Sequence, residues 1–188
     1  MASLGAVVGR AEFAYDCVMR FAEYWTGPNG LHFNRDLRRT GTSVFCGDDR
    51  PFTMEATCAI GAGISDMLVQ GWNDTVRVFP AVPSHWRDVG FRDLLAEGGF
   101  CVSAIRRDGR TAWVRARATV RRALRLRDPF DGEQVSVTGA DLRRDGDLFV
   151  GDLEAGQEVV LSLPGEGGDL DAAASAVQGS DTSRLGLR

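Results

Sequence analysis

Apolar residues recur every three or four positions over the first 25 residues of the chain, beginning at Leu4 and ending at Trp25. This spacing predicts one amphipathic helix with a wide apolar stripe. The stretch Gly-Pro-Asn-Gly at 27–30 is expected to end the helix, because proline cannot continue it and glycine tolerates a reversed backbone. A polar, arginine-rich connection is then expected from His32 to Arg50.

A second helix is predicted from about Thr53 to Gln70, with Gly71 as its C-terminal stop. Small residues dominate its first half, and they would let a neighbouring helix approach closely. The residues expected on its buried face are Ala59, Ile60, Gly63, Ile64, Met67 and Leu68. Two helices are too few to close a core of their own, so their broad apolar faces require a partner.

The hydrophobic pattern changes to strand-like alternation after about residue 75. Residues 99–120 predict a hairpin, in which Asp108 and Gly109 supply a two-residue turn with positive φ. Short strands separated by turns are then expected in the segments Ala-Leu-Arg-Leu-Arg, Gln-Val-Ser-Val-Thr-Gly, Asp-Leu-Phe-Val-Gly-Asp-Leu and Glu-Val-Val-Leu-Ser-Leu. Regular short strands of this kind favour an antiparallel β-sandwich.

The predicted fold class is therefore α+β, an N-terminal helical pair followed by an antiparallel β-sandwich domain. We place the helices in residues 1–74 and the sandwich in residues 75–163. Residues 164–188 are mostly Gly, Asp, Ala and Ser with few apolar side chains, so we expect a disordered tail there.

The composition of the 188-residue chain is that of a globular protein, with 44% hydrophobic and 26% charged residues. Its net charge of −4 gives no general attraction to nucleic acid or anionic lipid. No apolar run approaches the roughly 18–20 residues that a membrane span needs. We therefore expect neither a nucleic-acid partner nor a membrane. No compartment is indicated.

The cysteines form no Cys-x-x-Cys pair and match no zinc spacing, so we expect buried thiols and no metal site. They are Cys17, Cys46, Cys58 and Cys101.

A few side chains are candidates for chemistry. Glu55 is either a first-turn charge favoured by the helix dipole, with Thr53 as the N-cap, or half of an acid/base pair. His32 follows a turn, and it either lines a sugar pocket or is a surface-loop imidazole. Three tryptophans are further candidates, and they either stack on sugar rings or pack where the helices meet the sandwich. They are Trp25, Trp72 and Trp86.

Several motifs follow one another in order. They are Pro-Phe-x-hydrophobic-acid at 51–55, Met-Leu-Val-Gln-Gly at 67–71, Val-Phe-Pro-Ala-Val-Pro at 78–83 with Trp86, and Leu-Ala-Glu-Gly-Gly-Phe at 95–100. This ordered string resembles the C-terminal stretch of the family 95 glycoside hydrolases, of the α-L-fucosidase type. Upstream, Trp-Thr-Gly-Pro-Asn-Gly-Leu-His-Phe-Asn resembles the turn between the last helices of such barrels.

The resemblance implies that the two helices are the last helices of an (α/α)6 barrel and that the sandwich is the C-terminal domain of the protein. It also implies that Glu55 is catalytic, beside residues that hold the attacking water, while a separate Glu is the general acid. Glu55 stands where the family most often has Asp, and Thr57 stands where it has Asn. The expected substrate-binding residues are His32 and Thr57, and no metal or organic cofactor is implied.

Inversion at a sugar carbon needs two groups on opposite faces of the ring, roughly 6.5–9.5 Å apart, so one carboxylate cannot act alone. We expect a C-terminal fragment of an inverting exo-glycosidase for α-L-fucosides or related sugars, inactive alone because the general acid and the water-holding residues are missing. Its expected partners are a fucosylated or related glycan and the missing barrel segment, or a second copy bound through exposed helix faces. The alternatives are a carbohydrate- or protein-binding β-sandwich module and the structural remnant of a truncated gene.

Overall fold

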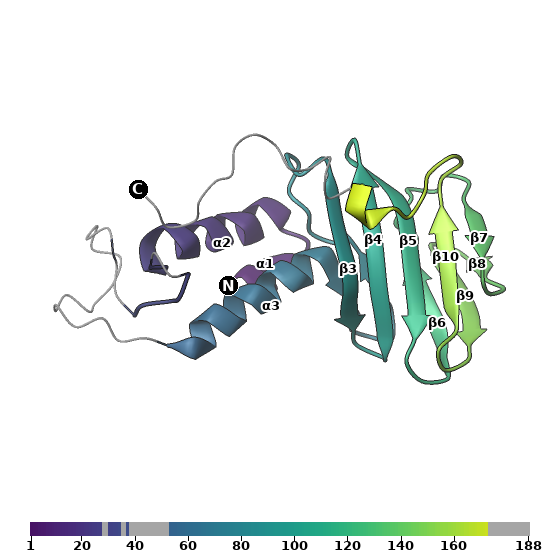
Figure 1. Ribbon diagram of the computed structural model, residues 1–188, viewed down its shortest axis with the longest axis horizontal. Helices are drawn as coiled ribbons and strands as arrows, with labels where there is room; N and C mark the ends of the chain where they lie inside the picture. Colours follow the sequence, from purple (N-terminus) through teal and green to yellow (C-terminus); the bar gives the residue numbers. More distant parts are fainter. Residues whose placement is uncertain (28–29, 35–36, 38–52, 173–188) are drawn as a thin grey trace.

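The structure, a computed structural model, describes residues 1–27, 30–34, 37 and 53–172. Helices form one end of the molecule and antiparallel strands form the other, with β3 beside the helices (Figure 1). The α+β fold class and the β-sandwich are thus confirmed. The helices are α1 (Ala2–Val7), α2 (Ala11–Trp25) and α3 (Met54–Leu68). None of the helices in the described part of the chain is long and apolar enough to cross a membrane.

The single N-terminal helix predicted by the apolar spacing is wrong, because the chain breaks it into α1 and α2. Gly9 lies between them with a φ of +72°, a left-handed conformation that ends α1 and redirects the chain. Its amide donates to the carbonyl of Ala6 at 3.1 Å, and the amide of Arg10 donates to that of Gly5 at 2.8 Å. The apolar spacing continues through this break, so periodicity alone could not reveal it.

α3 begins as predicted and ends two residues early, because Val69 and Gln70 are extended and form β1. Its small residues do admit a neighbouring helix. A Cβ added at Gly63 would lie 2.8 Å from the Cβ of Ala2 in α1. Within the expected buried face, Gly63 and Met67 are buried, Ile60, Ile64 and Leu68 are half-buried, and Ala59 is exposed.

The strands form two stacked antiparallel sheets and a short two-stranded ribbon. The ribbon pairs β1 (Val69–Gln70) with β2 (Arg77–Val78). The five-stranded sheet has the order β3-β4-β5-β10-β7, with bounds Val89–Ala96, Phe100–Arg107, Arg110–Ala118, Glu158–Ser162 and Ser136–Thr138. The three-stranded sheet has the order β6-β9-β8, with bounds Arg122–Arg127, Leu148–Leu153 and Arg143–Asp145.

The predicted hairpin is present as β4 and β5. Its turn residues have the positive φ that a tight two-residue turn requires, 50° at Asp108 and 80° at Gly109. β3 was not predicted, and a bulge explains why. The register shifts between Phe91 and Leu94, and Asp93 has a φ of 55°, so the alternation of apolar and polar positions is interrupted.

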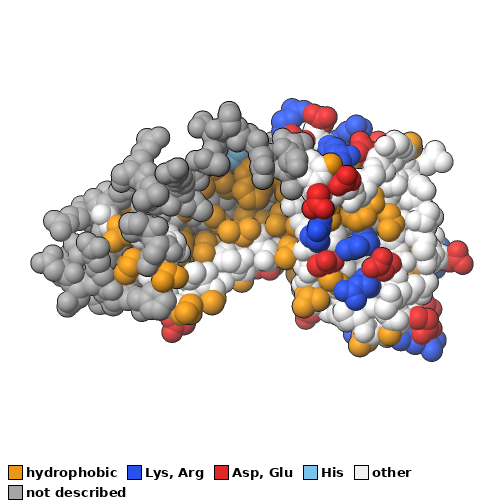
Figure 2. All heavy atoms as spheres, in the orientation of Figure 1, with side chains coloured by type: hydrophobic (Ala, Val, Ile, Leu, Met, Phe, Trp, Pro, Cys, Tyr) orange, Lys and Arg blue, Asp and Glu red, His pale blue; other side chains and the backbone are white. Residues whose placement is uncertain are grey.

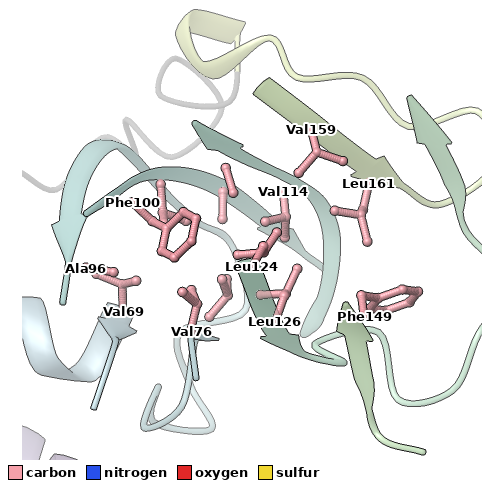
Figure 3. Close-up of a cluster of buried hydrophobic side chains, with 14 of the residues drawn as sticks. Val69, Val76, Ala96, Phe100, Val114, Leu124, Leu126, Phe149, Val159 and Leu161 are labelled. Atoms are coloured by element: carbon pink, nitrogen blue, oxygen red, sulfur yellow. The ribbon is translucent and has the colours of Figure 1, made fainter. Parts of the chain in front are cut away.

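The main core lies between the two sheets (Figure 3). Val114 and Leu161 of the five-stranded sheet point toward Leu124 and Leu126 of β6, and all four side chains are fully buried. On β6 the arginines that flank and separate these leucines are exposed, so one face of the strand is charged. Burial of these apolar side chains is the main stabilising contribution of the sandwich.

A second, smaller core joins the helices to the crossover that follows β2. Met67 and Ala81 are buried there, with Tyr15 and Trp86 packed against them. The rings of Tyr15 and Trp86 lie edge to face with centroids 5.6 Å apart. The carboxylate of Glu12 in α2 accepts hydrogen bonds from the amide and hydroxyl of Ser84, at 2.7 and 2.8 Å. Trp86 therefore packs at the junction, one of the two roles considered for the tryptophans.

Residues 164–172 pack on the outer face of the five-stranded sheet, which differs from the disorder expected there. Leu170 lies against Ile105 and Trp113. Glu166 pairs with Arg107, and Asp171 pairs with Arg92 at 2.8 Å. Residues 173–188 lie outside the described residues, and the proposed domain boundaries stay predictions.

Candidate functional site

The segment after α2 turns back and attaches to the start of α3. The amide of His32 donates to the hydroxyl of Thr57 at 3.2 Å, and its Nδ1 makes a short hydrogen bond with the hydroxyl of Thr53. The imidazole stacks on the ring of Phe21 with centroids 5.2 Å apart. His32 is only 6% exposed, so its interpretation as a surface-loop imidazole is wrong. These contacts define the His32–Thr53–Thr57 cluster.

The environment of His32 favours its neutral form. Burial lowers the pKa of the imidazole, because the charged form loses solvation, and a hydrogen bond to Thr53 opposes this shift. A neutral imidazole has one donor nitrogen and one acceptor nitrogen. Among the described residues, Nδ1 is engaged with the hydroxyl of Thr53.

Glu55 lies in the first turn of α3 and is exposed. Thr53 occupies the N-cap position, but its side chain makes no capping hydrogen bond to the helix and is directed to His32 instead. A carboxylate in the first turn compensates the partial positive charge of an incompletely capped helix end. The helix-start interpretation of Glu55 is therefore consistent with its surroundings.

The structure brings His32 and Thr57 together and directs Glu55 elsewhere. Successive helical residues are about 100° apart, so side chains two positions apart do not share a face. Glu55 is two positions from both Thr53 and Thr57, and both threonines contact His32. The catalytic role of Glu55 and the substrate-binding roles of His32 and Thr57 stay predictions. The motif residues Pro51 and Phe52 lie outside the described part of the chain.

Apolar side chains remain exposed on the helices. Leu4 of α1 is 62% exposed and Met54 of α3 is 56% exposed. Figure 2 shows a broad apolar area over the helical part of the molecule, continuing toward the sheet. The helices therefore present apolar surface to solvent that the sandwich does not cover.

A polar cluster on the outer face of the five-stranded sheet was not predicted. The carboxylate of Asp93 accepts hydrogen bonds from Arg115 at 2.8 Å, Ser103 at 3.3 Å and Cys101 at 3.5 Å. Burial opposes ionisation of Asp93, but these hydrogen bonds and the Arg115 charge together lower its pKa. Burial, followed by the contact with Asp93, raises the pKa of the Cys101 thiol. The cluster is thus an internally satisfied ion pair beside an unreactive thiol.

The sequence offered no signal for this cluster, because its members come from three strands and Asp93 occupies an irregular bulge. Figure 2 shows acidic and basic side chains interspersed over this face of the sheet. Such mixed charge is typical of a solvated sheet surface, and it gives no net attraction for a charged ligand.

The remaining chemistry predicted from the sequence concerned thiols and metals. Cys101 is buried and Cys17 is half-buried, but Cys58 is exposed on α3, so a buried thiol is the wrong expectation there. Cys46 lies outside the described residues. Within the described residues no group of three or more His, Cys, Asp or Glu side chains is arranged to hold a metal ion.

The fold and its contacts define an α+β protein whose larger part is an antiparallel β-sandwich. No family model and no curated protein matches the chain, so the resemblance to family 95 rests on the motifs quoted above. Among solved structures, a family 39 glycoside hydrolase from the gut symbiont Bacteroides cellulosilyticus WH2 is weakly similar, with 20% identity and a TM-score of 0.32. The match covers 40% of this chain and 17% of that protein, and it carries no argument about activity.

Proposed function

We propose that this chain is the C-terminal part of an inverting glycosidase for α-L-fucosides or related sugars. The observation that carries the proposal is the position of Glu55. Glu55 is exposed in the first turn of α3. The motifs that follow it along the chain lie in the crossover and the sandwich, in the same order as in the family that the sequence resembles. α2 and α3 would be barrel helices, and their uncovered apolar side chains would contact the remaining barrel.

In this proposal Glu55 is the general base that activates water. The general acid comes from a barrel segment outside this chain, because the two groups must flank the sugar ring. The His32–Thr53–Thr57 cluster holds the start of α3 in place. His32 and Thr57 are in this proposal the residues that contact the substrate. The extra methylene of Glu, compared with the Asp most common in the family, carries the carboxylate farther from the helix.

The test is hydrolysis of an aryl α-L-fucoside by this chain, alone and together with the barrel segment that the proposal requires. The chain alone is expected to show no turnover above background. The combination is expected to release fucose with inverted anomeric configuration, followed by proton NMR. Loss of a general base costs roughly 10²–10⁴-fold in rate, so Glu55→Gln is expected to abolish most of the turnover.

Asp16→Asn is the matched control, because Asp16 is an exposed helical acid on α2 whose partner is Arg20. It is expected to leave the rate unchanged. Turnover by the isolated chain, retention of configuration, or full activity in the Glu55→Gln variant would each contradict the proposal. Absence of any upstream reading frame for barrel helices would also count against it.

A further inference from the structure

A pocket of about 380 Å³ lies where α1 meets the ribbon and the start of the sandwich. Its apolar lining includes Val7, Val8 and Pro80, and its polar lining includes Trp72, Arg77 and Arg127. It is separate from Glu55. The pocket adjoins Gln70, just beyond the end of α3, and the distance along the helix axis from Glu55 to Leu68 is about 20 Å at the rise of an α-helix.

The floor of the pocket is held in place by Gln70, which is buried. Its amide nitrogen donates to the carbonyls of Ala6 at 3.1 Å and Asp66 at 2.8 Å, and its amide oxygen accepts from the indole of Trp72 at 2.9 Å. One side chain therefore joins α1, α3 and the ribbon. This network fixes Trp72, 40% of which is exposed, before any ligand arrives.

Within the described part of the chain, Arg77 is the cation of the pocket that makes no direct ion pair. Its guanidinium lies 3.7 Å from the centroid of the Trp72 ring, and its Nη1 donates to the carbonyls of Trp72 and Thr75, each at 2.9 Å. Within the described residues these are the hydrogen bonds it makes, so Nε and Nη2 have no partner there. A guanidinium with one edge fixed and two donors unused is suited to bidentate recognition of an oxyanion.

The charges near Arg77 also favour binding of an oxyanion. Arg127 also lines the pocket, and its only ion-pair partner in the described chain is Asp147, at 3.5 Å. Burial lowers the pKa of Arg77, repulsion from Arg127 lowers it further, and Asp147 opposes both. The remaining charge, Asp128, accepts hydrogen bonds from Arg144 at 2.6 Å and from backbone amides of its own turn. An anion between Arg77 and Arg127 would relieve their mutual repulsion.

We propose that this pocket binds a monosaccharide-sized organic anion, whose carboxylate or phosphate is held by Arg77 and Arg127 and whose non-polar face packs on Val7, Val8 and Pro80. The volume is within the range of small-molecule sites. The combination of a fixed aromatic ring, an apolar wall and two guanidinium groups matches a ligand that carries one anionic group and has a non-polar ring face. This binding does not depend on the proposed glycosidase function.

The experiment is isothermal titration calorimetry of the full chain, which measures the heat of binding of four compounds. They are D-galacturonate, D-glucose 6-phosphate, neutral methyl β-D-galactopyranoside and inorganic phosphate. Saturable binding is expected for at least one organic anion, and the preferred one identifies the charged group. The neutral sugar and inorganic phosphate are expected to bind more weakly by about tenfold or more, since the first lacks the anionic group and the second lacks the non-polar face. Binding should also weaken as salt is added, because the charges are partly exposed.

Arg77→Gln and Arg127→Gln are expected to weaken binding on the order of tenfold, the loss typical of a charge-assisted hydrogen bond. Arg143→Gln is the matched control, because Arg143 is an exposed arginine on β8 that does not line the pocket. Far-UV circular dichroism verifies folding, and Arg127→Gln decides the test if Arg77→Gln does not fold. No saturable binding, equal binding of the neutral sugar or of inorganic phosphate, or equal weakening by Arg143→Gln would overturn the proposal.

Discussion

At the scale of single residues, His32 couples the stability of the helical part to pH. Burial holds its pKa below the ordinary value of about 6.5, so near and just below that pH the unfolded chain binds more protons than the folded chain. Stability then rises with pH across this range. We expect a larger free energy of unfolding at pH 7.5 than at pH 5.5, measured by urea denaturation. His32→Gln should flatten this dependence.

His85→Gln is the control for this prediction, since His85 is the other histidine of the chain and is half exposed, beside Glu12. It is expected to preserve the pH dependence. Asp93 and Glu12 also have lowered pKa values, but carboxylates titrate near pH 4 and act below this range. Full pH dependence in the His32→Gln variant would show that the buried imidazole is not its source.

The sequence identified some candidate residues but not their partners. Thr53, Thr57 and Glu55 could be placed at the start of a helix from local signals. The hydroxyl of Thr53 bonds to His32, which is 21 residues away in the sequence, and no local pattern encodes this contact. The guanidinium donors of Arg77 that find no partner among the described residues could not be predicted either, because charge patterning does not report which guanidinium groups find a counterion.

At the scale of elements, the contact between α1 and α3 depends on one glycine. A Cβ at Gly63 would meet the Cβ of Ala2 at 2.8 Å, whereas a Cβ at Gly61 would meet no atom of the described residues within 4 Å. We expect Gly61→Ala to stabilise the protein by about 0.5–1 kcal/mol through helix propensity. Gly63→Ala should destabilise it by about 1–2 kcal/mol, since overpacking outweighs the same gain.

Urea unfolding followed by circular dichroism measures both variants under one set of conditions. The two substitutions occupy the same helix two positions apart, so the difference between them isolates the cost of displacing α1. Equal stabilisation by both variants would mean that α1 does not pack on Gly63.

The elements that could be predicted are those whose signals are local. The Asp108–Gly109 turn and the alternation on either side of it defined the β4–β5 hairpin. The bulge at Asp93 concealed β3, and the left-handed Gly9 divided a helix whose apolar spacing continues across the break. In both cases a single backbone conformation overrides the period of the sequence.

At the scale of the whole molecule, the change from helical to alternating periodicity was sufficient to predict an α+β fold with a sandwich. It was not sufficient to predict how the two parts join. That junction is built from the buried pair Met67 and Ala81, from the Glu12 carboxylate on Ser84, and from Gln70. These contacts link segments up to 72 residues apart, and each is specified by packing after the elements form.

The uncovered helix surface gives the last prediction, which concerns the molecule as a whole. Exposed contiguous apolar surface binds hydrophobic dyes and promotes association. We expect the folded chain to enhance anilinonaphthalene sulfonate fluorescence and to elute from size exclusion as more than a monomer. Leu4→Gln combined with Met54→Gln should reduce both signals, and exposed substitutions of this kind change stability by only about 0.5 kcal/mol.

The matched control is Leu95→Gln combined with Val120→Gln, on the sandwich, where the two side chains are 74% and 53% exposed. The exposure of these side chains is comparable to that of the helical pair, so a general effect of surface hydrophobicity would lower dye binding similarly in both variants. If the dye binds specifically to the helical surface, only the substitutions at Leu4 and Met54 would lower its fluorescence. Equal responses, or a monomeric chain that does not bind the dye, would show that the helices need no partner and would remove the main physical support for a missing barrel.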